Sequence, residues 1–195
     1  NEVSSNWDIA AEEVYKVRPH RAASMEYLMQ ALLQPITGKF VSSKNVYRTW
    51  QDLLRTNEAG EPIKFSEEIL ESSKIFALIG SDRVNNYNER LAGARTFSVV
   101  QHLPAALVSA KKFYKSMPET YSQAIDFLDA RTVLSLFAEE GANTLNDQIW
   151  EYSKAIGDLS SNAEPSELLS ALNFSEENFN NLAAAMKPRF EQMRY

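Results

Sequence analysis

Hydrophobic residues recur along the chain at the three- and four-residue spacing of amphipathic helices. The spacing is clearest over residues 81–117, where apolar side chains repeat one helical turn apart and then give way to a nearly all-apolar run at residues 97–108. A helix that is apolar on every side is typical of a buried position. We therefore expect residues 81–117 to form the centre of the fold, with Ser81 as N-cap. The stretch is expected to be a helical hairpin or one helix kinked at Pro104, because proline removes a backbone donor.

Prolines, glycines and short polar loops divide the rest of the chain into further helical segments. No segment alternates apolar and polar residues as a half-buried strand does. The pattern therefore predicts an all-α fold, a bundle of roughly eight helices joined by short loops with little or no sheet. Besides the central stretch, the expected helices cover residues 6–17, 20–34, 44–56, 66–80, 118–140, 143–156, 166–172 and 175–187.

Individual residues fix the expected ends and contacts of these helices. Pro35 and Gly38 are expected to end the second helix, and Ser66 is expected to cap the fourth. The small residues at positions 92–94 leave room for another helix to approach closely. In the helix over residues 44–56, the spacing predicts a buried side formed by Val46, Tyr47, Trp50, Leu53 and Leu54.

Length and composition are those of an ordinary globular protein. The chain has 195 residues, of which 44% are hydrophobic and 24% charged, and this is enough for one core. We expect a single helical domain over residues 1–195, with the loop at residues 57–62 as a candidate sub-boundary and residues 188–195 as a candidate C-terminal tail. There is no run of about 18 apolar residues, so we expect no membrane span. The chain begins at Asn1, which indicates processing or trimming and leaves the compartment open.

The residue types and spacings of common catalytic sites are missing from the sequence. With no cysteine, it offers no disulfide, thiolate metal site or cysteine nucleophile. Neither His20 nor His102 has a glutamate three residues earlier, as helical di-iron sites require, and no glycine-rich phosphate loop occurs. Asp126 and Asp129 share a helix face but lack the further carboxylates of a magnesium-diphosphate site. We therefore expect a protein that is not an enzyme, with no catalytic residue, no metal site and no cofactor.

Charge is distributed unevenly along the chain. The net charge is −6, but residues 119–177 contain twelve acidic and two basic side chains and so carry −10, which leaves +4 for the remainder. This uneven distribution of charge favours the docking of the acidic region onto a basic surface of a protein partner or of a second copy. The alternative is an acidic surface that only faces water. The candidate partner-binding residues are Glu119, Asp126, Asp129, Glu139, Glu140, Asp147 and Glu151.

Two short clusters, at residues 111–115 and 187–195, mix cations with aromatic rings. Proteins that hold single-stranded nucleic acids combine cations for the phosphates with rings for the bases. The same pattern arises when a helix turns its lysines to water and its rings to the core. The candidate contacts to an anion or nucleic acid are Lys111, Lys112, Lys115, Lys187, Arg189 and Arg194.

Three functional hypotheses follow from these observations. The first is a non-enzymatic helical interaction or assembly protein, with a structural or scaffold role, that acts through its charge-polarised surface. The second is a nucleic-acid-coating, nucleocapsid-like protein. The third is a helical small-ligand-binding protein or enzyme with a pocket near His102 and Tyr87. We take the first as the working hypothesis, because no catalytic constellation is found and the charge is polarised.

Overall fold

Helices make up most of the described chain, as the apolar spacing predicts. The computed structural model describes residues 2–17, 22–38, 41–56, 61–138, 140–173, 180 and 184. Within these residues there are nine defined helices and no strand, so the all-α prediction is confirmed. The helices are α1 (Glu2–Val14), α2 (Met25–Thr37), α3 (Ser43–Arg55), α4 (Pro62–Ile79), α5 (Ala92–Thr96), α6 (Leu103–Phe113), α7 (Pro118–Phe137), α8 (Ala142–Asp158) and α9 (Pro165–Leu172).

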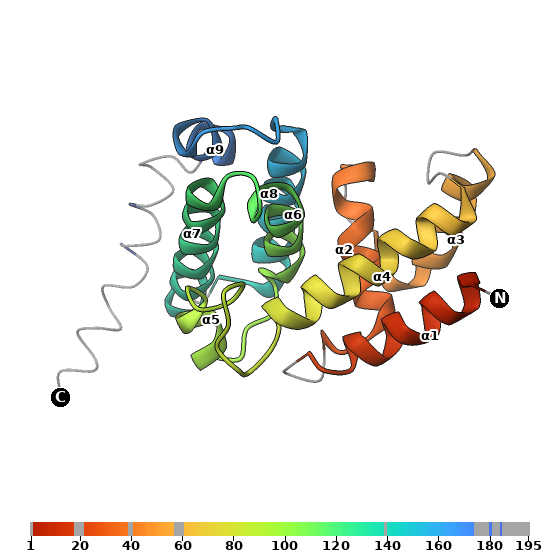
Figure 1. The fold of residues 1–195 in the computed structure, drawn as a ribbon. Coiled ribbons are helices and arrows are strands. Elements are labelled where there is room, and N and C mark those ends of the chain that lie inside the picture. Colours follow the sequence, from red (N-terminus) through yellow and green to blue (C-terminus); the bar gives the residue numbers. More distant parts are fainter. Residues whose placement is uncertain are drawn as a thin grey trace.

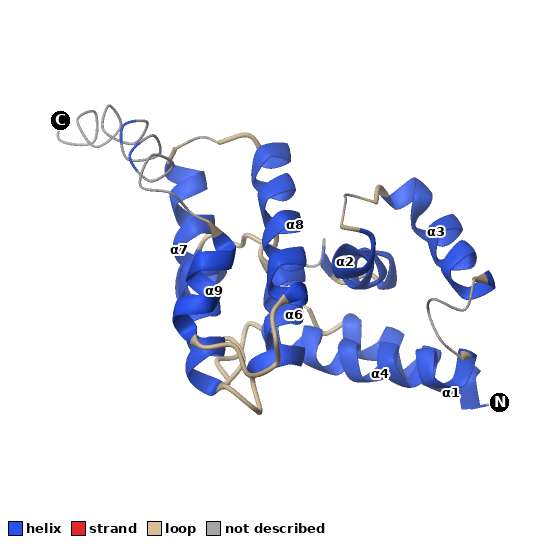
Figure 2. Ribbon diagram, turned by 90° about the horizontal axis from the view of Figure 1, so that it is seen from above, coloured by secondary structure: helices blue, strands red, loops and turns tan. Residues whose placement is uncertain are grey.

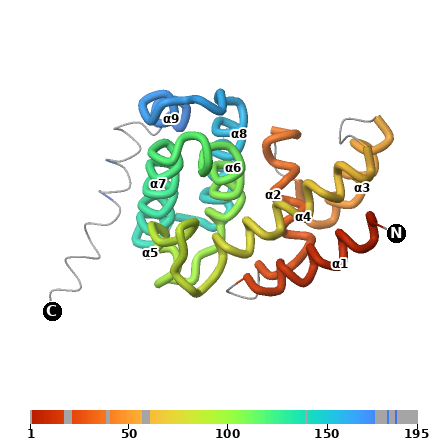
Figure 3. The backbone as a smooth tube through the Cα atoms, in the orientation of Figure 1, coloured from red at the N-terminus to blue at the C-terminus, as the bar shows by residue number. Residues whose placement is uncertain are grey.

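Helix α6 lies at the centre of the packing. It contacts α2, α4, α7 and α8, while α1 packs along α4 and α9 covers the ends of α7 and α8. Figure 1 and Figure 3 show α1–α4 on one side of the molecule and α5–α9 on the other. Leu103 and Leu107 of α6 and Phe76 of α4 are fully buried, and each such side chain stabilises the fold by about 2 kcal/mol. The burial expected for the apolar run is thus confirmed over α6, whereas Phe97 before it is 48% exposed.

Residues 81–91 form a loop, so the prediction of a helix there is wrong. The buried side chain of Asn88 organises this loop. Its amide nitrogen donates to the carbonyl oxygens of Leu78, Ser81 and Arg83 at 2.8–3.1 Å, and its oxygen accepts a backbone N–H at 2.9 Å. These bonds give the backbone an alternative to the helical ladder, which is why asparagine is unfavourable inside helices.

The loop is followed by two helices instead of one. Pro104 lies in the first turn of α6, where its missing N–H has no helical partner, so it starts this helix and does not kink it. The five-residue helix α5 packs against α7. A Cβ atom on Gly93 would lie 2.4 Å from Cγ2 of Val133, so the close helix approach expected at residues 92–94 is confirmed.

Two helix ends differ from those expected. Helix α2 continues past Pro35, which was expected to help end it, and ends at Gly38 as expected. Gly38 adopts the left-handed conformation with φ 63°. Pro35 is tolerated because it lies in the last turn, where it removes only one backbone bond. Helix α4 begins at Pro62, one turn before Ser66. Ser66 is therefore not the cap; it is buried within α4, and its hydroxyl donates to a carbonyl of the preceding turn at 2.8 Å.

Helix α3 packs mainly against α2 and leaves its other side to solvent. Of the five side chains expected to be buried, Val46, Trp50 and Leu53 are buried, with the Trp50 indole donating to a backbone carbonyl at 3.1 Å. Tyr47 is 73% exposed and Leu54 is 37% exposed, so the prediction is wrong for these two. A helix with one main neighbour can bury only one stripe of its surface.

Candidate functional site

Two of the acidic candidates serve contacts within the fold. The carboxylate of Asp129 accepts the backbone N–H groups of Gly93 at 3.1 Å and of Ala94 at 2.7 Å, and so caps α5 from α7. Asp126 forms an ion pair with Arg90 at 2.7 Å, in which both side chains are about half exposed. Asp129 is therefore already used in holding α5, and Asp126 is partly neutralised.

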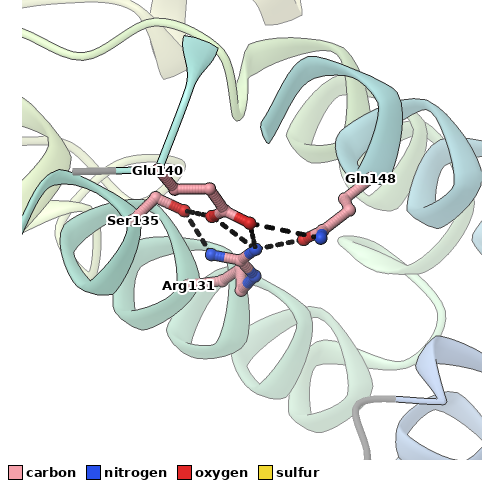
Figure 4. A network of polar contacts seen from close by, with 4 residues as sticks. All are labelled: Arg131, Ser135, Glu140 and Gln148. Atoms are coloured by element: carbon pink, nitrogen blue, oxygen red, sulfur yellow. Dashed lines mark hydrogen bonds and ion pairs between the residues drawn. The ribbon is translucent and has the colours of Figure 1, made fainter. Parts of the chain in front are cut away.

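Glu140 belongs to a buried polar network between α7 and α8 (Figure 4). Its carboxylate accepts from the guanidinium of Arg131 at 2.7 and 2.9 Å, and from the hydroxyl of Ser135. Arg131 also donates to Ser135 and to Gln148 of α8. Burial raises the pKa of the neighbouring Tyr152 hydroxyl, an effect that the positive charge of Arg131 opposes. The network joins two helices and the turn between them, which is a structural role.

The remaining acidic candidates in the described part of the chain are solvent-exposed. Glu119 lies in the first turn of α7, where a negative charge complements the helix dipole. Asp147 and Glu151 lie one turn apart on the outer face of α8. Within the described residues none of the three forms an ion pair. Glu139 lies outside the described residues.

The basic candidates of α6 have partners within the protein. The ammonium of Lys111 contacts Glu68 of α4 at 2.6 Å and also bonds a serine hydroxyl at 3.0 Å. Lys112 donates to the carbonyl of Gly157 near the C-terminal end of α8 at 2.5 Å, where a cation complements the helix dipole. Burial lowers the pKa of Lys112. Lys115 is exposed, whereas Lys187, Arg189 and Arg194 lie outside the described residues.

The outer face of α3 is a basic and apolar stripe that the sequence interpretation missed. Lys44 and Arg48 are exposed and lie one turn apart, and within the described residues neither forms an ion pair. Arg55 continues the stripe and lies 3.7 Å from an aspartate. The exposed side chains of Tyr47 and Leu54 lie beside these cations on the helix. In the sequence, each of these two exposed residues stands directly before an arginine. This placement is typical of an exposed amphipathic face and could have indicated the stripe.

A cavity of about 230 Å³ lies beside His102, between the end of α4, the loop at residues 81–91 and the start of α6. Its inner wall is apolar and includes Leu91 and Leu103, each 1% exposed. Ser98, which also lines it, adopts φ 54°, a region that non-glycine residues rarely enter. A cavity therefore lies near His102, where the sequence predicts a pocket. The sequence did not predict which other side chains line it.

His102 and Arg95 are the polar side chains that set the chemistry of this cavity. His102 is 4% exposed, and burial lowers its pKa to about 4, so it is neutral at pH 7. Its Nδ1 has no hydrogen-bond partner among the described residues. Arg95 donates to the backbone oxygen and the side-chain oxygen of Asn88 at 3.2 and 3.3 Å, and within the described residues it has no ion pair.

Tyr87 lines a different cavity, so the structure does not place it with His102. This second space of about 240 Å³ lies between the loop at residues 81–91 and α7. Tyr87 and Tyr114 stack with their ring centroids 3.9 Å apart, and Tyr121 meets both rings edge-on. The Tyr121 hydroxyl donates to the backbone oxygen of Tyr87 at 2.7 Å, and burial raises the pKa of both residues. Because the stacked faces of Tyr87 and Tyr114 cover each other, the cluster mainly anchors the loop.

Among the described residues, no group of three or more histidine, aspartate or glutamate side chains is arranged to hold a metal ion. None of the described helices combines the length and the apolar character needed to cross a lipid bilayer.

Comparisons with protein-family models, with curated proteins and with solved structures found no significant match to this chain. The fold therefore defines the class, an all-α multi-helix protein, and functional inference rests on its surfaces and cavities.

Proposed function

We propose that this protein is a helical assembly protein whose copies associate head to tail. The basic stripe of α3, defined by Lys44 and Arg48 with Tyr47 and Leu54, would contact the acidic face of α8 in the next copy. The observation that carries the proposal is the presence of two exposed helical faces of opposite charge, both without ion-pair partners at these positions in the described chain.

The spacing of the charges supports this pairing. Lys44 and Arg48 are four residues apart on α3, and Asp147 and Glu151 are four residues apart on α8. On a helix, this separation places successive Cβ atoms about 6 Å apart. Two helices laid side by side can therefore match both cations to both carboxylates. Tyr47 adds a large amphipathic ring beside the cations, the kind of side chain that is enriched in interfaces.

The positions of the helices favour contact between copies over contact within one copy. Figure 2 shows α3 at the end of the molecule away from α7 and α9, with α2 between α3 and α8. Figure 1 shows the same separation from another side. One copy therefore leaves its basic stripe and its acidic face open at the same time. Such a heterologous contact continues from copy to copy and produces rings or filaments.

Sedimentation velocity of two charge-reversal variants tests the proposal. One variant carries Lys44→Glu with Arg48→Glu, and the other carries Asp147→Lys with Glu151→Lys. We expect the unmodified protein to form species larger than a monomer at low salt and to dissociate at high salt, because exposed charges are screened. Each variant alone should be monomeric. An equal mixture of the two should assemble again, because the intact α3–α8 pair and the reversed pair are both complementary in charge.

A matched control separates this contact from the effect of total charge. Lys74→Glu with Lys115→Glu changes the net charge by the same amount as the α3 variant, but both residues lie outside the stripe. This control should assemble as the unmodified protein does. A monomeric unmodified protein at low salt, or a mixture of the two face variants that remains monomeric, would rule out the proposed contact.

The nucleic-acid-coating alternative stays a prediction and has weaker support. Lys111 and Lys112 have partners inside the protein, so phosphate groups would compete with these contacts. Lys115, which follows α6, is exposed. Binding of labelled single strands over a salt series tests this alternative, because phosphate contacts give a steep salt dependence.

A further inference from the structure

The cavity beside His102 has the size and shape of a site for a small molecule. Its volume is about 230 Å³, below the roughly 300 Å³ at which sites for drug-sized ligands begin. Ile79, Leu91 and Leu103 form its inner side, and each is at most 3% exposed. This lining favours an aliphatic or aromatic group over a sugar or a nucleotide, whose hydroxyl groups would lose their hydrogen bonds to water there.

His102 provides a polar group that the fold itself does not satisfy. The residue is 4% exposed, and within the described residues its Nδ1 lacks a hydrogen-bond partner. Buried polar atoms without partners are rare, because each lowers the stability of the fold. Because His102 lines the cavity, its imidazole can contact a molecule bound there.

Arg95 gives the cavity a positive charge. Its guanidinium lies against the neutral side chain and backbone of Asn88, and the described residues contain no carboxylate within 4.0 Å of it. Asp82 also lines the cavity, but it is exposed and water screens its charge. A partly buried guanidinium without an ion pair is suited to a carboxylate, which accepts two parallel N–H bonds.

We propose that this cavity binds a small monocarboxylate with an apolar body, held by Arg95 and contacted by His102. The carboxylate accepts from the guanidinium at the polar side of the cavity. The hydrocarbon part lies against the apolar inner side, where it is removed from water. A doubly charged phosphate fits less well, because Arg95 is the one cationic side chain that lines the cavity within the described residues. The site is separate from the charged faces of α3 and α8, so it stands or falls independently of self-association.

Histidine-selective NMR provides a direct test, because the chain contains only His20 and His102. The protein is labelled at its histidine side chains, and the His102 signal is assigned with a His102→Gln variant. The probes are hexanoate, hexanamide and hexylamine, which share the hydrocarbon chain and differ in their polar end. We expect hexanoate to shift the His102 signal in a saturable way, hexanamide to act at least about tenfold more weakly, and hexylamine to have no effect.

Two variants check the role of Arg95. Arg95→Gln should weaken hexanoate binding by at least about tenfold, whereas Arg95→Lys should retain part of it because the charge remains. Arg83→Gln is the matched control, since Arg83 is exposed and does not line the cavity, and it should bind as the unmodified protein does. Circular dichroism confirms that each variant is folded. The absence of a His102 shift with hexanoate, or equal binding by the amide and the acid, would overturn the proposal.

Discussion

Two buried polar side chains of this protein have opposite surroundings. Arg131 is 2% exposed, and its charge is met by Glu140 together with Ser135 and Gln148. His102 is 4% exposed, and its Nδ1 is left without a partner in the described chain. A buried charge needs partners, because its transfer out of water is unfavourable by several kcal/mol. A neutral imidazole can remain incompletely bonded at a smaller energetic penalty.

The difference separates a structural centre from a candidate binding centre. The Arg131 network leaves little room for another molecule, since its members already bond one another across α7 and α8. His102 lies beside a cavity that also contains Arg95. A buried polar group that is bonded across two helices stabilises their packing, whereas His102 beside the cavity is the group on which the proposed ligand site depends.

The largest expected effect comes from breaking the buried ion pair. Glu140→Ala leaves the guanidinium of Arg131 buried and uncompensated, so we expect a loss of roughly 4 kcal/mol in the free energy of unfolding. Glu151→Ala, at an exposed position of α8, should change it by less than about 0.5 kcal/mol. Urea denaturation measures both values. Equal losses in the two variants would mean that the network is not a structural centre.

The pH dependence of stability tests the surroundings of His102. Its folded-state pKa of about 4 lies below its ordinary value of 6.5, so between these values the unfolded chain binds a proton that the folded protein does not. The contribution of His102 to the free energy of unfolding is therefore fully present above pH 6.5. It decreases as the pH falls and is smaller by roughly 3 kcal/mol at pH 4. His102→Gln should remove this part of the slope. An identical pH profile for both proteins in urea denaturation would show that His102 is not buried in its neutral form.

Asn88 lines the same cavity, and its side chain is fully hydrogen-bonded, so its contribution to the stability of the fold can be compared with that of His102. Asn88→Ala removes its bonds to three carbonyl oxygens and one N–H group, and we expect a loss of about 2 kcal/mol in the free energy of unfolding. Asn86→Ala, at an exposed position of the same loop, should have almost no effect. Thermal unfolding compares the two. If both lose the same stability, the loop does not depend on Asn88.

The smallest effect is expected for the exposed counterpart of the buried pair. Asp126→Asn removes the charge that Arg90 contacts at 2.7 Å. Both side chains are about half exposed, so water and salt weaken the attraction, and we expect a loss of about 0.5 kcal/mol or less. In urea denaturation, the difference from the unmodified protein should become smaller from low to high salt. A loss as large as that of Glu140→Ala would contradict the distinction between exposed and buried pairs.

The sequence predicts the helical class of this protein because burial of one helix side leaves a local signal. The expected helices at residues 118–140 and 143–156 agree with α7 and α8 to within a few positions, since Pro118 and Gly141 mark their starts. The failure at residues 81–91 has an equally local cause. Val84 and Tyr87 have helical spacing, but the bonds of Asn88 hold the backbone in a loop.

The surfaces and cavities were harder to predict because they depend on distant packing. The spacing predicts Tyr47 and Leu54 as core residues, but they are exposed because α3 has few neighbours. The burial of His102 follows from its apolar neighbours in sequence. The role of Arg95 does not, because it depends on how the end of α4 meets the loop and α6. The acidic candidates show the same limit, since spacing alone did not separate Asp129, which caps a helix, from the exposed Glu151.

The single main neighbour of α3 has a consequence for its dynamics. A helix with few tertiary contacts opens locally at a lower free energy than the core, so its amide protons exchange sooner with solvent deuterons. We expect amides near Trp50 to exchange faster than those near Leu107 of the central helix α6. The segment that carries the basic stripe should then unfold locally more easily than the central helix, and binding of another copy would protect its amides.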